Sequence, residues 1–137
     1  MKKLLIGFVA VFITLEVLDM LIHGVILMNT YMSMQNVWRP DMMNKMWVLH
    51  FVKIITAFFF ALIFSKGYEN KGIMEGLRYG FYVGMIVSSG FAFGSYASFP
   101  IRYQLGLQWF FYSLVEYLIA GVVIALVFGR KEAAPKA

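Results

Sequence analysis

Four long apolar stretches dominate the sequence and restrict the folds that the chain can adopt. They cover residues 4–28, 47–64, 79–99 and 105–128. A helix needs about 20 mostly apolar residues to cross a hydrocarbon layer of roughly 30 Å, and each stretch is close to that length. The alternation of a β-barrel is absent, and open sheets cannot exist in lipid. The sequence therefore predicts an all-α integral membrane protein, an antiparallel four-helix bundle with these stretches as its spans.

The composition agrees with this class. Apolar residues make up 61% of the chain and charged residues only 14%, whereas soluble domains have about 45–50% and about 25%. So few charges cannot cover a water-exposed surface, which excludes a nucleic-acid-binding module and an ordinary cytosolic enzyme. The absence of cysteine excludes disulfides, thiolate metal sites and a cysteine nucleophile. We expect residues 1–137 to form a single transmembrane domain that ends in a flexible cytoplasmic tail at 129–137.

The basic residues predict the orientation of the spans. If there are four spans, one side of the membrane holds Lys2, Lys3, Lys66, Lys71, Arg78, Arg130, Lys131 and Lys136. The opposite side holds only Arg39, Lys45 and Arg102. The positive-inside rule therefore predicts that both termini are cytoplasmic, and all three tryptophans then fall near the outer interface. The first stretch is longer than a signal-peptide core and carries charges, so we expect it to be retained.

Ionisable side chains interrupt three of the four predicted spans. They are Glu16, Asp19, His23, His50, Lys53 and Glu116. Each costs about 2.5–3.5 kcal/mol within a span, so such groups usually face a bundle interior. The helical rise groups them by depth as the two glutamates, Asp19 with Lys53, and the two histidines. We expect the first, second and fourth spans to surround a common polar core in which at least one glutamate holds a proton.

This polar cluster has two functional interpretations besides a structural one. Intramembrane carboxylates are typical of proton and ion routes, which makes a proton-coupled small transporter or channel an alternative. The relay would then consist of Glu16, Asp19, Glu116 and Lys53. Against transport, a bundle of this size has little room for alternating access unless it dimerises. In addition, no span is broken by glycine or proline near its middle.

A haem- or copper-binding membrane protein is a further alternative. His23 and His50 can supply two imidazoles near the outer surface, and methionine thioethers bind Cu(I). The outer loop and its helix ends are rich in methionine, with Met28, Met32, Met34, Met42, Met43 and Met46. Methionine is also an adaptable apolar side chain, which explains such a segment without a metal. We therefore expect no cofactor, with haem or copper as the alternative.

The third predicted span carries small residues in place of ionisable ones. These small residues are Gly76, Gly80, Gly84, Ser88, Gly90 and Gly94. The first four follow one another at intervals of four residues, and the last two are also four residues apart. Because apolar burial gives helices no reason to associate in lipid, close approach through small residues is what packs them together. We expect these residues to pack against another helix of the same chain, with a homodimer contact as the alternative.

Short motifs give the chain a resemblance to a known group of proteins. The segment 67–72 reads Gly-Tyr-Glu-Asn-Lys-Gly, the segment 75–80 reads Glu-Gly-Leu-Arg-Tyr-Gly, and the first span contains His23-Gly24. With these motifs the chain resembles small four-span bacterial membrane proteins that form a family of unknown function. The resemblance covers most of the chain and implies a location in the bacterial inner membrane. It implies no catalytic or binding role for any residue.

No arrangement of residues in the sequence is typical of catalysis. A phosphate-binding loop would need Gly-Lys-Ser/Thr after a strand, and neither is present. We therefore expect a protein that is not an enzyme, and that acts as an accessory or scaffold subunit of a larger membrane complex or as a homo-oligomer. Its surroundings would be the lipid bilayer, and nucleic acid would not be a partner.

Overall fold

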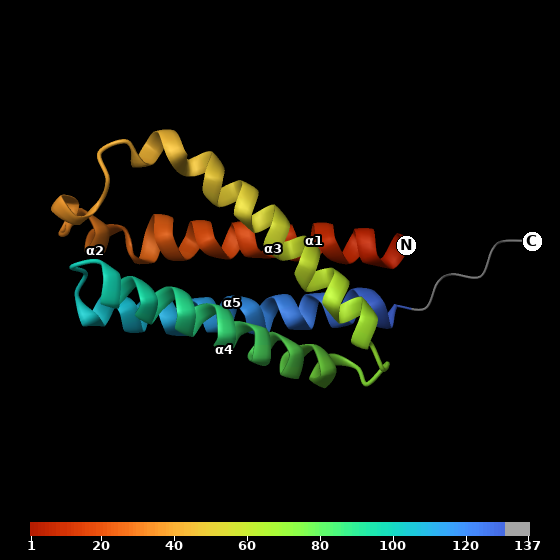
Figure 1. Cartoon of the computed structure of the whole chain (residues 1–137). Helices are drawn as coiled ribbons and strands as arrows, with labels where there is room; N and C mark the ends of the chain where they lie inside the picture. The colour runs from red at the N-terminus through yellow and green to blue at the C-terminus, as the bar shows by residue number, and fades with distance from the viewer. Residues whose placement is uncertain (131–137) are drawn as a thin grey trace, which may run out of the picture.

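The computed structural model describes residues 1–130, and every regular element in this part of the chain is a helix (Figure 1). The long helices are α1 (Lys2–Leu21), α3 (Met46–Gly67), α4 (Ile73–Ser98) and α5 (Tyr103–Gly129). The short ones are η1 (Ile22–Ile26), α2 (Met28–Met32), η2 (Gln35–Val37) and η3 (Met42–Lys45). The predicted all-α class is confirmed. The tail predicted at 129–137 lies almost wholly outside the described residues.

Three helical stretches are long and apolar enough to cross a membrane, as expected for a membrane protein. They are Lys2–Ile26, Met42–Gly67 and Tyr103–Gly129. These stretches correspond to the first, second and fourth predicted spans, and the second is longer than the predicted 47–64. The stretch predicted at 79–99 is also helical and lies in α4, but α4 is not among the three stretches that are apolar enough to span a membrane. With 26 residues α4 is long enough, and its many small and polar residues make it less apolar.

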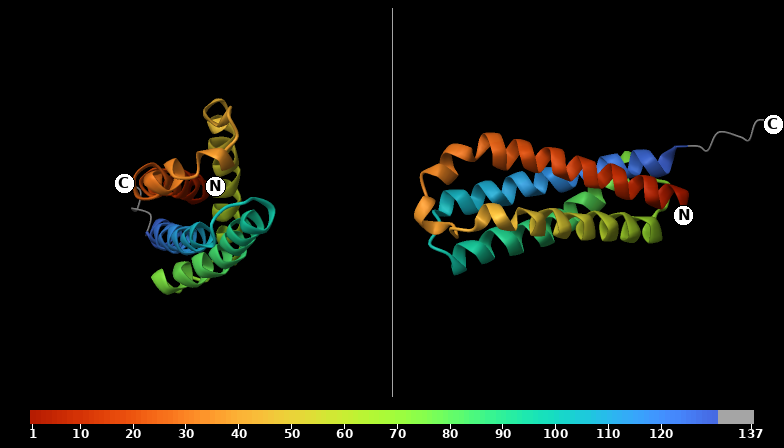
Figure 2. Two further views of the ribbon diagram at one scale, coloured as in Figure 1. Left: turned by 90° about the vertical axis from the view of Figure 1, so that its left-hand side faces the viewer. Right: turned by 90° about the horizontal axis from the view of Figure 1, so that it is seen from above.

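The long helices contact one another in the order α3, α1, α5, α4. α1 packs against both α3 and α5, and α4 packs along α5 (Figures 1 and 2). The N-terminus lies at the same end as the end of α5, where Lys3 Nζ donates a hydrogen bond to the Phe128 carbonyl at 2.9 Å. α3 is inclined to the others, so that its Met46 end diverges from α4 and α5 (Figure 1).

The inclination of α3 confines its apolar packing to its second half. Its buried residues are Ala57, Phe60, Ala61 and Phe64. At this end α3 also reaches α4, because the Tyr79 hydroxyl donates a hydrogen bond to the Phe60 carbonyl at 2.7 Å. The first half of α3 has only α1 as an extended neighbour. Between Met46 and Ala57, α3 therefore has no fully buried side chain.

Glycine allows α4 and α5 to approach each other closely. A Cβ atom at Gly80 would lie 2.2 Å from the Tyr117 carbonyl oxygen, and one at Gly76 would lie 2.0 Å from that of Gly121. Neither position could hold a larger residue without separating the helices. Gly84, Ser88 and Ala92 continue the same buried face of α4. Contact between small residues and a facing backbone is the usual way in which helices pack in lipid.

The structure corrects the prediction for two of the packing residues. A Cβ atom at Gly90 or Gly94 would meet no atom within 4 Å, so neither residue packs against another helix of this chain. The reason is helical geometry. Gly90 follows Ser88 by two residues, which rotates it by roughly 200° away from the packed face. A four-residue spacing between two glycines therefore did not identify the face that they occupy.

The turn between α3 and α4 contains the residues of the resemblance motif. Asn70 and Gly72 both have a positive φ, 60° and 72°. The Glu75 carboxylate accepts hydrogen bonds from the backbone N–H groups of Glu69 at 2.6 Å and Lys71 at 2.7 Å. A side chain in the first turn of α4 thus fixes the path of the chain that precedes it.

We expect Gly80→Ala to destabilise the protein by about 1–3 kcal/mol, because the added methyl group overpacks the contact with α5. Gly90→Ala is the matched control. It adds the same methyl group to the same helix in open space, and we expect it to be neutral or slightly stabilising. Thermal unfolding of both variants in detergent measures the difference. Equal stabilities would contradict the packing described here.

Candidate functional site

The candidate site is a group of polar side chains where α1 passes beside α3. Lys53 on α3 forms an ion pair with Asp19 on α1 by direct contact between Nζ and Oδ2. The predicted pairing of these two residues is confirmed. Lys53 is mostly shielded, with 15% of its side chain exposed, while 35% of the Asp19 side chain is exposed. The pair therefore lies at the edge of the α1–α3 contact.

A second contact joins the same two helices one turn away. Nδ1 of His50 lies 3.0 Å from both carboxylate oxygens of Glu16. Because α1 and α3 are antiparallel, the pair Glu16–His50 and the pair Asp19–Lys53 cross each other. The length of the lysine side chain allows this crossing. The two pairs together connect the helices where few apolar contacts do so.

The structure corrects two of the pairings expected from depth. The two histidines do not share partners, and Glu16 contacts His50 rather than Glu116. The expectation treated each helix as perpendicular to the membrane. Because α3 is inclined to α1, equal distance from the middle of a helix does not by itself identify the partner of a residue: Asp19 and Lys53 meet, whereas His23 and His50 do not.

His23 lies in η1, a short π-helical segment that continues α1. Its Nε2 atom is 3.5 Å from Asp19 Oδ1, and its Nδ1 atom forms a hydrogen bond with the Tyr31 hydroxyl. The rings of His23 and Tyr31 are stacked, with centroids 5.8 Å apart and planes 4° apart. Single turns of π-helix within an α-helix occur frequently at functional sites. Here the turn places His23 between a carboxylate and a phenol.

Tyr31 is the residue that sequence reasoning missed. Its hydroxyl accepts a hydrogen bond from Trp109 Nε1 at 2.7 Å, and its carbonyl accepts one from Trp38 Nε1 at 3.0 Å. Both tryptophan rings pack against the Tyr31 ring. The two tryptophans were expected at the outer interface for their amphipathic character alone. Nothing in the spacing of the sequence indicates that both tryptophans donate hydrogen bonds to Tyr31.

The partners of Tyr31 determine the direction of each hydrogen bond. Indole nitrogen can only donate, so Trp109 gives its hydrogen to the Tyr31 oxygen. Asp19 lies 3.5 Å from Nε2 and favours the tautomer of His23 with its hydrogen on that atom, and in this tautomer Tyr31 donates to His23 Nδ1. Burial raises the pKa of Tyr31 to about 12, so the hydroxyl keeps its hydrogen at neutral pH. A connected series of polar groups thus runs from Trp109 through Tyr31, His23 and Asp19 to Lys53.

Glu116 on α5 is the most deeply buried ionisable residue of the predicted cluster, with 6% of its surface exposed. Its Oε1 atom has no hydrogen-bond partner among residues 1–130. Lys53 is near enough for its charge to interact with Glu116 and with Glu16. An unpaired polar atom in a buried position costs free energy, which makes Glu116 the least satisfied group in this region.

The residues considered for metal or haem do not converge in the described part of the chain. No group of three or more His, Cys, Asp or Glu side chains in residues 1–130 is arranged to hold a metal ion. His23 and His50 are each engaged with other partners. Of the methionines, Met34 is buried, while Met28, Met32, Met42 and Met43 are exposed and Met46 begins α3. Among residues 1–130 the structure therefore gathers no group of three or more histidine and acidic side chains that could hold a metal ion.

Comparison with protein-family models, curated proteins and solved structures gives no match for this chain.

Removing the Tyr31 hydroxyl tests the importance of this centre. We expect Tyr31→Phe to lower stability by about 1–3 kcal/mol, because the Trp109 N–H loses its acceptor and His23 its donor. Tyr82→Phe removes a hydroxyl from an exposed tyrosine on α4 and should have almost no effect. The measurement is thermal unfolding in detergent, followed by tryptophan fluorescence. An unchanged unfolding temperature for Tyr31→Phe would show that the centre contributes nothing to stability.

Proposed function

We propose that the chain is an integral protein of the bacterial inner membrane that spans it four times with both termini in the cytoplasm. It acts as a non-enzymatic accessory or scaffold subunit, either in a larger membrane complex or as a homo-oligomer. One observation carries this proposal. In the isolated chain, 57% of the His50 side chain and 25% of the Glu16 side chain are exposed, although both lie within apolar stretches. Intramembrane ionisable groups almost always face protein or water, so either a protein neighbour or water must lie against this pair.

The surroundings of His50 support a protein neighbour. The outer half of α3 exposes Trp47, Leu49, Phe51 and Val52 on a helix whose extended contact is α1 alone. A further transmembrane helix placed here would cover the Glu16–His50 pair and the exposed apolar side chains of this half of α3. Polar contacts between helices are a common means of association in lipid. In the assembly, the neighbouring helix would cover the side of the bundle that this half of α3 leaves exposed.

The arrangement of α4 supports the fourth span. α4 runs antiparallel to α5 and in contact with it, and α5 is long and apolar enough to span. The faces of α4 that point away from α5 expose large apolar residues, including Phe81 and Ile86. A helix with this surface, paired with a spanning partner through glycine, is suited to lipid on its outer face. Four spans also agree with the distribution of basic residues on the two sides.

The assembly is testable by cross-linking, because the chain has no cysteine of its own. A single Leu49→Cys substitution places a thiol beside His50 on the exposed face of α3. We expect a bismaleimide to join it, in membranes, to a second copy or to another membrane protein. Ile86→Cys, on the exposed face of α4, is the matched control and should remain uncross-linked.

Two further observations complete this test. Replacing His50 by Leu in the Leu49→Cys variant should reduce cross-linking, because the polar contact is lost. A protein that gives no cross-link in membranes and purifies in mild detergent as a monomer without partners would overturn the proposal.

A proton-coupled carrier or channel is the second candidate, favoured by a different observation. Glu116 is buried without a partner for Oε1 and lies in electrostatic range of Lys53, which pairs with Asp19. A carboxyl group in this position could take up and release a proton beside a fixed ion pair. The relay would consist of Glu116, Lys53, Asp19 and Glu16.

We expect Glu116→Gln to abolish pH-driven flux in proteoliposomes if the protein carries protons, because the amide cannot release a proton. The measurement is the fluorescence of a pH-sensitive dye trapped inside the vesicles after an external acid step. Glu75→Gln, in the first turn of α4, is the control and should leave the flux unchanged. Equal flux with the wild-type protein and with Glu116→Gln would remove the carrier from consideration.

A further inference from the structure

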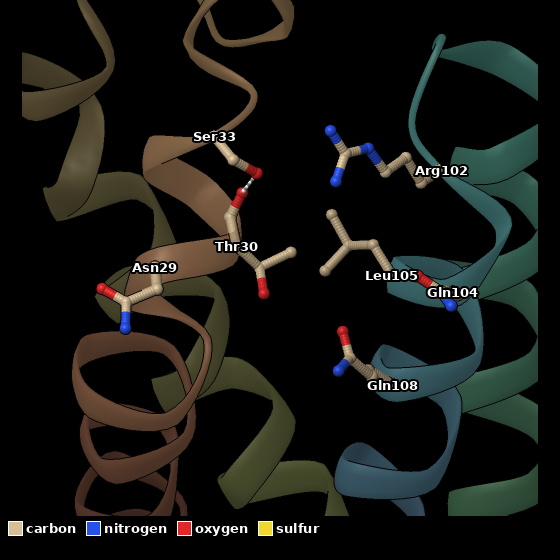
Figure 3. Close-up of a pocket in the computed structure, with 7 residues that line it drawn as sticks. All are labelled: Asn29, Thr30, Ser33, Arg102, Gln104, Leu105 and Gln108. Atoms are coloured by element: carbon tan, nitrogen blue, oxygen red, sulfur yellow. Dashed lines mark hydrogen bonds between the residues drawn. The ribbon is translucent and has the colours of Figure 1, made fainter.

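A polar cavity lies at the end of the molecule where α1 leads into α2 and where α5 begins (Figure 3). Its volume is about 260 Å³. One wall contributes Asn29, Thr30 and Ser33, and the other contributes Arg102, Gln104 and Gln108. The two walls come from segments far apart in the sequence. The cavity is separate from the polar centre at Tyr31 and from the cluster between α1 and α3.

Arg102 gives this cavity its charge. No acidic residue lines the cavity, and Arg102 forms no ion pair within residues 1–130. Figure 3 shows its guanidinium group in the space between the two walls. Arg39, the other arginine of the predicted outer side, differs in this respect. Its Nε atom lies 2.6 Å from Asp41 Oδ1, so its charge is already neutralised.

Leu105 adds one apolar side chain to the lining, and the remaining lining groups are neutral hydrogen-bonding side chains. Asn29, Gln104 and Gln108 each offer an amide, and Thr30 offers a hydroxyl. Ser33 already donates its hydrogen to the Thr30 carbonyl at 2.7 Å. One unpaired guanidinium among neutral donors and acceptors suits a phosphate ester. The planar fork of arginine binds two phosphate oxygens at once, and amides can hold the esterified polar group.

The position of the cavity relative to the apolar helices indicates where a phosphate ester that binds there would come from. Asn29 follows closely after Ile26, where the first apolar stretch ends, and Arg102 immediately precedes Tyr103, where the last one begins. The cavity therefore lies at the ends of two stretches that are long enough to span. If the chain spans the membrane as proposed above, this depth corresponds to the phospholipid headgroups.

We propose that this cavity is a binding site for a phosphate ester, with Arg102 as its cationic anchor. The phosphodiester of an anionic glycerophospholipid supplies this chemistry from within the bilayer, and free glycerol phosphate supplies it from solution. The inference rests on the proposed membrane location for the depth of the site. It does not rest on the proposed partner at α3, which lies on another face.

The test uses the full chain purified in a neutral detergent, with phosphatidylglycerol and phosphatidylcholine as lipid probes and glycerol 3-phosphate as the soluble probe. Native mass spectrometry counts retained lipid, and thermal unfolding measures stabilisation. We expect phosphatidylglycerol to be retained and to stabilise the wild-type protein more than phosphatidylcholine does. Arg102→Gln should weaken retention by about tenfold, the expected loss for one charged hydrogen-bonding partner.

Matched variants distinguish specific binding in the cavity from nonspecific attraction of an anionic lipid to positive surface charge. Arg39→Gln removes the same charge from the same side outside the cavity, and we expect it to retain phosphatidylglycerol as the wild type does. Arg102→Lys should retain it at an intermediate level, because it keeps the charge without the fork. Gln108→Leu should weaken retention of phosphatidylglycerol while leaving the Arg102 guanidinium in place. It replaces Arg102→Gln as the test variant if Arg102→Gln does not fold.

The outcomes distinguish the two sources of ligand. Phosphatidylglycerol binding that glycerol 3-phosphate neither reproduces nor displaces assigns the site to the lipid headgroup. Equal stabilisation by glycerol 3-phosphate, lost in Arg102→Gln, assigns it to the free ester. Equal retention of both lipids, or an equal loss in Arg39→Gln and Arg102→Gln, overturns the proposal. Cross-linking at Leu49→Cys tests the proposed assembly separately. If the cross-link is absent while phosphatidylglycerol is still retained through Arg102, the assembly is contradicted and the lipid site is not.

Discussion

The half of α3 that begins at Met46 has one extended neighbour, α1, and two polar pairs join it to that helix. The buried apolar residues of α3 begin only at Ala57, so the pairs Glu16–His50 and Asp19–Lys53 are the main contacts on the other side of that point. In hydrocarbon these groups have no water as an alternative partner. The two crossed pairs therefore hold this half of α3 against α1, and the inclination of α3 exposes the face where we place a neighbouring helix.

Several elements of this arrangement follow from sequence reasoning. Long apolar stretches predict helices, because only a helix satisfies its own backbone in lipid. The four-residue spacing of Gly76, Gly80, Gly84 and Ser88 predicts one packed face of α4, which the close approach to α5 displays. The pairing of Asp19 with Lys53 also follows from helical rise, since the flexible lysine side chain tolerates an error in the predicted depth.

Other parts of the site depend on geometry that no local pattern contains. His50 pairs with Glu16 because α3 is inclined, and an inclination arises from the packing of whole helices rather than from the residues at one level. Tyr31 reaches His23 because the chain passes through a π-helical turn and then a short helix, which brings residue 31 back against residue 23. Trp109 joins them from a helix that is distant in the sequence. Spacing rules describe one helix at a time and cannot reveal such a meeting.

The hydrogen-bond direction at Tyr31 limits how protons can move through this region. A proton passes along a series of groups only if each group can exchange the roles of donor and acceptor. The indole of Trp109 has a hydrogen to give and no lone pair to receive one. The series is consequently closed at that end, and a proton that reaches His23 from the side of Asp19 must leave by the way it came. Among the described residues, this branch therefore offers no hydrogen-bonded path from His23 to the loop beyond.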